Sequence, residues 1–212
     1  MRAFTAVVAD QRSVEWYLAR AGRLTGSRAG DMLATIKSGE AAARRDYRMQ
    51  LVCERITSIP QENGYVNAEM QRGIDLEPAA RAAYEAHTGE LVRQTGFLSH
   101  NELMAGCSLD GDVNDYQGIV ELKCPKSATH LRYLRGSVPP SEYMPQITHN
   151  LWMTGAQWCD FGSYDDRFPD PLKLFVVRVH RKDLDIAAYE AAALKFLAEA
   201  QDETDAVRRL AA

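Results

Sequence analysis

AGCSLDGDVNDYQGIVELKCPK, residues 105–126, is the stretch that decides the fold of this chain. Residues 115–118 predict a turn between two extended segments, because Asp and Gly supply turn chemistry. Side chains two positions apart on a strand share a face, about 6–7 Å apart. Glu121 and Lys123 therefore share a face of the second segment, and a hairpin would bring Asp110 close to both.

This cluster is costly unless a cation balances it. Two neighbouring carboxylates such as Asp110 and Glu121 repel each other, and one takes up a proton if no positive charge is near. Magnesium is held in proteins by one or two carboxylates together with water and substrate phosphate. A lysine beside the metal, here Lys123, would orient or deprotonate water and offset charge on phosphorus. The alternative is an exposed hairpin with an incidental ion pair.

Asp110 followed by Glu121-x-Lys123 resembles the signature of the PD-(D/E)XK nucleases. The longer pattern, GCSLDG at 106–111 and ELKCP at 121–125, is similar to the phage lambda exonuclease and YqaJ-type viral recombinase family. The resemblance extends from about residue 16 to residue 179. Alternation by itself does not choose between Asp110 and Asp112 as the metal carboxylate, and the family pattern Ser-x-Asp-Gly selects Asp110.

The resemblance implies a set of metal ligands. Asp110 and Glu121 would hold one or two Mg²⁺ ions, with Mn²⁺ as a substitute and the Leu122 carbonyl as a further ligand. Family members carry another carboxylate on a helix with Gly followed by Glu-Pro, which corresponds to Glu77 in this chain. Asp75 is the weaker alternative, and the competing interpretation makes Glu77 a favourable charge at a helix start.

The helix that would carry Glu77 spans residues 67–87, with Asn67 as its N-cap and Gly89 just after its end. Pro78 either bends this helix or begins a new one, because proline removes a backbone donor.

Phosphate contacts are expected at three positions. Ser27 would cap a helix over residues 28–37, and a helix start with a nearby arginine favours an anion. The resemblance implies that Arg20 and Ser27 hold the 5′-phosphate of a DNA end. Ser108, on the face of Asp110, would contact another phosphate. The alternative is a capping serine and a solvated arginine.

A further helix is expected over residues 139–155, where Tyr143 and Gln146 lie on one face. The resemblance implies that Gln146 meets the water or phosphate of the active site and that Tyr143 touches DNA. Family members place a phosphate-binding arginine where this chain has Thr129. His130 and Arg132 are nearby, but neither is assigned that role.

The length of 212 residues suits a single domain with a proper core. The resemblance implies an α/β fold with a restriction-endonuclease-like core: a mixed central sheet flanked by helices. Strands are expected at 91–98, 158–164 and 172–180. A helix over 183–211 would serve as a scaffold or as an oligomer contact. The four cysteines lack a C-x-x-C pattern, which favours free buried thiols over an iron–sulfur cluster.

Net charge is −4 and the sequence pI is near 5.8, which argues against a large exposed DNA-binding face. Basic residues crowd residues 12–55 and acidic residues dominate 183–205, so the sequence predicts a local basic channel or two helices with opposite solvated faces. No apolar run reaches the roughly 18 residues of a membrane span, and a cytoplasmic location is expected.

The resemblance implies an exonuclease that degrades one strand of duplex DNA from a phosphorylated 5′ end and leaves a 3′ single strand. It also implies a single-strand annealing protein as partner in phage-type recombination, and a ring-shaped homotrimer around DNA. Two alternatives stay open. One is an endonuclease or repair nuclease with the same core, and the other is a DNA-binding relative that has lost catalysis.

Overall fold

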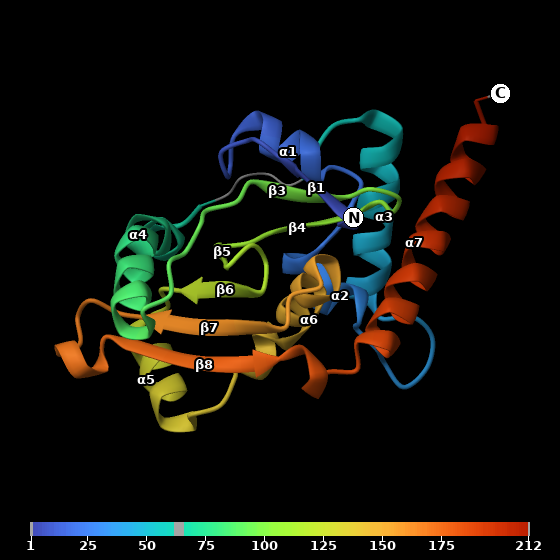
Figure 1. Cartoon of the computed structure of the whole chain (residues 1–212). Coiled ribbons are helices and arrows are strands. Elements are labelled where there is room, and N and C mark those ends of the chain that lie inside the picture. Colours follow the sequence, from blue (N-terminus) through green and yellow to red (C-terminus); the bar gives the residue numbers. More distant parts are fainter. Residues whose placement is uncertain (1, 62–65, 212) are drawn as a thin grey trace.

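The computed structural model describes residues 2–61 and 66–211 of the chain, which form two four-stranded sheets with helices around them (Figure 1). In the first sheet the strand order is β1 (Phe4–Val7), β3 (Phe97–His100), β4 (Ala105–Ser108) and β2 (Leu24–Thr25). In the second sheet it is β5 (Gly111–Val113), β6 (Gly118–Lys123), β7 (Trp158–Tyr164) and β8 (Leu174–His180). Both sheets mix parallel and antiparallel pairs, so the predicted α/β class is confirmed.

Helices pack on both faces of the second sheet, α4 on one and α6 on the other. In Figure 1, α4 stands at one end of the sheets, while α3 and α7 run side by side at the other end. The α-helices are α1 (Val14–Arg20), α2 (Ala29–Met32), α3 (Ala42–Thr57), α4 (Ala68–Thr88), α5 (Ser127–Gly136), α6 (Met144–Thr154) and α7 (Ile186–Arg209). Short 3₁₀ turns lie at Gly26–Arg28 (η1), Ser141–Tyr143 (η2), Asp170–Leu172 (η3) and Arg181–Asp183 (η4).

The predicted hairpin is formed by β5 and β6. Gly111 lies opposite Val120 and Val113 opposite Gly118, so the turn falls between residues 113 and 118 as expected. Strand β6 then pairs in parallel with β7 on its other side. The chain leaves the first sheet after β4 and enters the second at β5, and Asp110 lies in this short connection.

The N-terminal strands differ from the sequence prediction. A strand over 91–98 is wrong, because β3 begins only at Phe97 and the side chain of Leu91 is 83% exposed. The first strand is instead β1, which pairs antiparallel with β3. The strand predicted at 158–164 is confirmed, the one at 172–180 begins two residues later, and the C-terminal helix is present as α7.

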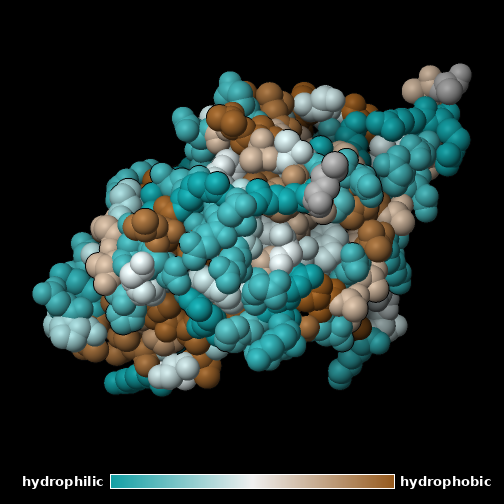
Figure 2. All heavy atoms as spheres, viewed as in Figure 1, coloured by the Kyte–Doolittle hydropathy of each residue, from teal (hydrophilic) through white to brown (hydrophobic). Residues whose placement is uncertain are grey.

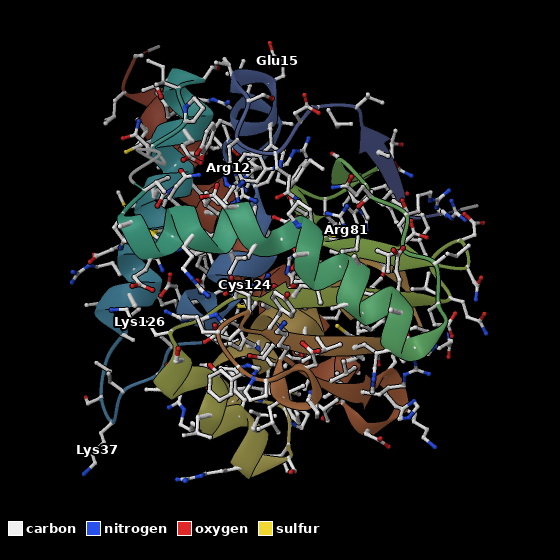
Figure 3. The ribbon with its side chains drawn as sticks, turned by 90° about the vertical axis from the view of Figure 1, so that its left-hand side faces the viewer. Arg12, Glu15, Lys37, Arg81, Cys124 and Lys126 are labelled. Carbon is white, nitrogen blue, oxygen red and sulfur yellow. The ribbon has the colours of Figure 1, made fainter. Side chains whose placement is uncertain are left out.

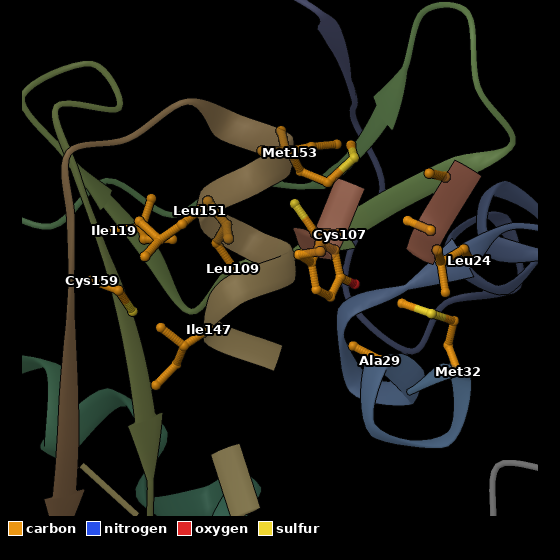
Figure 4. Close-up of a cluster of buried hydrophobic side chains, with 14 of the residues drawn as sticks. Leu24, Ala29, Met32, Cys107, Leu109, Ile119, Ile147, Leu151, Met153 and Cys159 are labelled. Atoms are coloured by element: carbon orange, nitrogen blue, oxygen red, sulfur yellow. The ribbon is translucent and has the colours of Figure 1, made fainter. Parts of the chain in front are cut away.

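Helix α6 lies at the centre of the main hydrophobic core. Figure 4 shows Ile119 and Cys159 of the second sheet on one side of α6, and Leu24 and Met32 of the N-terminal segment on the other. The alternation of β6 sends the side chains of Val120 and Leu122 to the opposite face, into a smaller core beneath α4.

The opposite charges of the N-terminal and C-terminal regions meet in one interface. Arg44 of α3 lies 2.7 Å from Glu199 of α7, and Arg48 donates to Glu203 at 3.0 Å. The prediction that these arginines line a basic channel is therefore wrong, because Arg44 and Arg48 pair with the acidic helix α7. The prediction of buried thiols also needs correction, since Cys53 is exposed.

On the face shown in Figure 2, hydrophilic side chains cover most of the surface, and apolar ones gather around α1, where Val14 is 70% exposed. Within residues 2–61 and 66–211, no helix is long and apolar enough to cross a membrane.

Buried His149 on α6 predicts a pH-dependent stability. Its Nδ1 lies 2.7 Å from the Tyr189 hydroxyl and its Nε2 lies 2.9 Å from the Gly106 carbonyl oxygen. Burial lowers the pKa of His149 to about 4. The unfolded chain therefore binds more protons than the folded one between about pH 4 and pH 6.5, so stability falls as pH falls through that window.

We expect proton binding by His149 in the unfolded chain to lower the free energy of unfolding by about 3 kcal/mol as the pH falls from about 6.5 to about 4. Urea unfolding at several pH values measures this. The His149→Gln variant should flatten this dependence, whereas His87→Gln, at an exposed position on α4, should leave it unchanged. An unchanged pH slope in His149→Gln would contradict the assignment.

Candidate active site

Asp110 occupies the open edge of β6. Strand β5 pairs only with residues 118–120 of β6, and beyond this point the Asp110 carboxylate accepts the backbone NH of Leu122 at 2.7 Å. The NH and CO of one strand residue point to the same edge, so the Leu122 carbonyl also faces this edge. The expected proximity of Asp110 to the Glu121–Lys123 segment is thus present.

The Glu121 side chain is buried beside Asp110, at 1% exposure. Gln146 of α6 donates to Glu121 Oε1 at 2.7 Å, and Asn150, one turn later, donates to Oε2 at 3.3 Å. Lys123 forms an ion pair with the same carboxylate, as their shared strand face predicts. Each carboxylate oxygen thus has a donor, which offsets the cost of burying the charge.

The environment raises the pKa of both ionisable groups of this ion pair, Glu121 and Lys123. Burial raises the pKa of Glu121 to about 7; the Lys123 charge opposes the rise and the Asp110 charge adds to it. Burial would lower the pKa of Lys123, but the carboxylates of Glu121 and Asp110 outweigh that effect and raise it. Lys123 is therefore an ammonium group in this arrangement.

Glu77 faces the same edge from α4. This helix is capped by Asn67 and runs through Pro78 without interruption. No new helix therefore begins at Pro78. Burial raises the pKa of Glu77, and the nearby Asp110 charge raises it further. Asp75 is exposed and accepts from Gln71 on its own helix, so its side chain is engaged away from Asp110.

The predicted phosphate-binding residues are linked to one another through Trp16. Arg20 donates to the Ser27 hydroxyl at 3.2 Å, and its guanidinium lies 4.1 Å from the Trp16 ring centroid. The Trp16 indole NH donates to the Ser108 hydroxyl at 2.9 Å. Ser27 is not the N-cap of a helix over 28–37, because it lies inside η1 and α2 is only four residues long.

Tyr143 closes the other side of the cluster. Its ring stacks on Phe161 with centroids 5.1 Å apart, and the Lys123 ammonium lies 5.4 Å from its centroid.

The structure also places Asp112, which strand alternation by itself does not distinguish from Asp110. Asp112 is 1% exposed and accepts from Arg93 and from the Tyr116 NH, so it stabilises the hairpin turn.

The two residues near Thr129, His130 and Arg132, each contact other parts of the protein. The His130 ring is buried, with one nitrogen 2.7 Å from the Ser163 hydroxyl and the other 2.8 Å from the Leu172 carbonyl oxygen. Arg132 donates to Glu142 at 2.7 Å on the exposed face of α5.

Two surface grooves meet at the carboxylates. We call the first, of about 980 Å³, the arginine groove; Arg2, Arg81 and Arg93 are among its lining residues. The second, of about 770 Å³, is the lysine groove, and it is lined by Lys123, Lys126 and Tyr143 among others. Both grooves are lined by Gln11, Arg12, Ile74, Glu77 and Asp110.

The donor set fits a hard divalent cation. Carboxylate and carbonyl oxygens from Asp110, Glu121, Leu122 and Glu77 are the ligand types that Mg²⁺ prefers. In the described part of the chain, no group of three or more His, Cys, Asp and Glu side chains is arranged to hold an ion by itself. Asp110, Glu121 and Glu77 therefore do not hold an ion by themselves in this arrangement, and at a magnesium site water and substrate phosphates would have to complete the shell.

Sequence reasoning missed some of these contacts. It gave no role in the site to Trp16, although the Trp16 indole NH donates to the Ser108 hydroxyl. It gave no role to Asn150, for which the four-residue spacing from Gln146 was the available signal. It also placed Arg12 only within a general basic region, and nothing in the local pattern distinguishes Arg12 from its neighbours.

Comparison with known proteins gave one family and several structures. The family model described as the YqaJ-like viral recombinase domain matches residues 15–157. The crystal structure of an alkaline exonuclease (LHK-Exo) from Laribacter hongkongensis is 40% identical, with a TM-score of 0.84, and the match covers 94% of this chain and 98% of that chain. A structure of LHK-Exo in complex with dAMP matches equally well.

A phage related exonuclease from Haemophilus somnus 129PT has a TM-score of 0.65 at 12% identity, over 90% of this chain and 96% of that one, and it shows similarity of fold. A search of curated proteins found no match.

The contact between Gly26 and Asn150 predicts an energetic coupling. A Cβ added at Gly26 would lie 2.5 Å from Asn150 Oδ1. We expect Gly26→Ala to destabilise the protein by about 1–3 kcal/mol, as overpacking does, and to push Asn150 away from Glu121. Adding Asn150→Ala should recover part of this loss, and a double-mutant cycle of urea unfolding measures it. Purely additive changes would contradict the contact.

Proposed function

Because the chain belongs to the family of YqaJ-like viral recombinase domains, we propose that it is a divalent-metal-dependent exonuclease acting on linear duplex DNA. The single observation that carries this proposal is the edge of β6. There Asp110, the Leu122 carbonyl and the Glu121–Lys123 pair lie together where two grooves meet. A relative with 40% identity over nearly its whole length is itself an alkaline exonuclease.

The ligands for one or two Mg²⁺ ions, with Mn²⁺ as a substitute, would be Asp110, Glu121, the Leu122 carbonyl and Glu77. When bound, the metal would supply Lewis-acid polarisation of the scissile phosphate. The raised pKa of Lys123 makes it a donor, so we assign it to orienting water and stabilising phosphate charge rather than to removing a proton. Gln146 and Asn150 fix the Glu121 carboxylate in position.

We assign the recognition of a 5′-phosphate to Arg20, Ser27 and Ser108. Arg20 donates to Ser27, and the Trp16 indole NH donates to Ser108, which lies two residues before Asp110. A guanidinium and two hydroxyls suit a terminal phosphate, and such a pocket next to the cleavage site would set a 5′-to-3′ direction. Tyr143, on the rim of the lysine groove, would contact the DNA.

The product would be a duplex with a 3′ single-stranded overhang, which a single-strand annealing protein would take over in phage-type recombination. We further propose that the chain is one nuclease domain over residues 1–212, with the C-terminal helix as an oligomer contact in a ring-shaped trimer. Sedimentation equilibrium would give the subunit number.

We predict that Asp110→Ala, Glu121→Ala and Lys123→Ala each abolish degradation of a 5′-phosphorylated linear duplex, because each removes a ligand or a charge at the scissile phosphate. For Lys123→Ala the loss should be about 10²–10³-fold, as for other donors that stabilise charge in the transition state. Magnesium-dependent release of nucleotides measures this, and a chelator should stop the reaction of the parent protein.

Duplex binding should survive the two carboxylate substitutions. The proposal fails if the parent protein releases no nucleotide from the linear duplex with magnesium or manganese. Cleavage of a closed circle at a similar rate would instead indicate an endonuclease.

Arg20→Ala should slow degradation of phosphorylated ends far more than that of unphosphorylated ends, because it removes a charge-assisted hydrogen bond of about 1.5–3 kcal/mol. Initial rates on two duplexes that differ only in the 5′-phosphate test this. Arg45→Ala, at an exposed position on α3, is the matched control and should leave both rates unchanged. Equal slowing on both duplexes by Arg20→Ala would refute the 5′-phosphate pocket.

A further inference from the structure

Arg12 lies in the connection between β1 and α1 in an unfavourable backbone conformation. Its φ angle is 70°, in the left-handed region that side chains with a Cβ rarely adopt. Holding a non-glycine residue there costs free energy, and such outliers gather at binding and catalytic sites. The side chain is exposed, so hydrophobic packing does not account for this cost.

The other arginines of the arginine groove are already paired. Arg2 contacts Asp115, Arg81 lies 3.5 Å from Glu77, and Arg93 donates to Asp112 at 2.8 Å. By contrast, the Arg12 guanidinium makes no hydrogen bond or ion pair with any residue in the described part of the chain.

Arg12 also lies where the two grooves meet. It lines both of them together with Glu77 and Asp110. Figure 3 shows Arg12 on one side of α4, with Cys124 and Lys126 on the other side. The carboxylates at this junction would repel DNA, and an unpaired cation beside them offsets that repulsion.

We propose that Arg12 binds a backbone phosphate of the DNA at the junction of the two grooves. This inference rests on the proposed function, because it assigns a further contact to the same substrate. A guanidinium offers several donors in a plane that matches phosphate oxygens. The unfavourable backbone at residue 12 holds this cation over the carboxylates, and Lys123 approaches from the lysine groove.

The test is duplex binding in the presence of a chelator, measured by fluorescence anisotropy over a range of salt concentrations. Loss of one phosphate contact reduces the slope of log K against log salt by about 0.9. We expect this reduction, with an affinity loss of about tenfold, for Arg12→Gly. The matched control Arg209→Ala, which removes an exposed arginine at the end of α7, should keep the parent slope.

Two more measurements separate binding from a structural role. Arg12→Gly should have an equal or higher Tm than the parent, because glycine tolerates the left-handed backbone. Arg12→Lys should keep most of the salt slope. An unchanged slope in Arg12→Gly, or a lowered Tm that accompanies the weaker binding, overturns the proposal. The binding comparison needs no metal. A parent protein that binds duplex in chelator but releases no nucleotide when magnesium or manganese is added would refute the exonuclease function and leave the Arg12 comparison valid.

Discussion

The buried carboxylate of Glu121 is the constraint on which the arrangement of this protein depends. A carboxylate at 1% exposure is tolerated only when hydrogen bonds and an opposite charge replace the lost water. Lys123 supplies the charge, and Gln146 and Asn150 supply the donors. Leaving a buried polar group without its hydrogen-bond partner costs about 1–3 kcal/mol, and more for a charged group, so the donors of α6 favour its position over this face of β6. The site and the main core are therefore built by the same contact between helix and strand.

The change from one sheet to the other creates the opening at the site. The connection between β4 and β5 places Asp110 where a further strand residue would otherwise pair with Leu122. The Asp110 carboxylate takes over that backbone NH, and the adjacent carbonyl remains directed at the open edge. A continuous strand would have closed this edge, so the break in the ladder is what gives access to oxygen ligands.

The distribution of charge explains how an acidic protein with a net charge of −4 presents positive groups to DNA. Arg44 and Arg48 of α3 pair with glutamates of α7, far from the two grooves. They therefore add little to the electrostatic potential inside the grooves. The cations that line the grooves lie close to the carboxylates, where a phosphate would bring negative charge. Local placement, rather than total charge, therefore governs binding at this site.

The sequence by itself determined the local features of this protein. Alternation placed Glu121 and Lys123 on one face, and Asn67 and Gly89 marked the ends of α4, because these signals depend on neighbouring residues. Only the tertiary structure decided the rest. It joined Asp110 to the Leu122 NH and Asp112 to Arg93, paired β1 with β3, and set Asn150 between Gly26 and Glu121. Among the residues that the structure describes, it also gave Arg12 no hydrogen bond or ion pair at the junction of the two grooves. These outcomes depend on contacts between segments far apart in the chain, which no local pattern encodes.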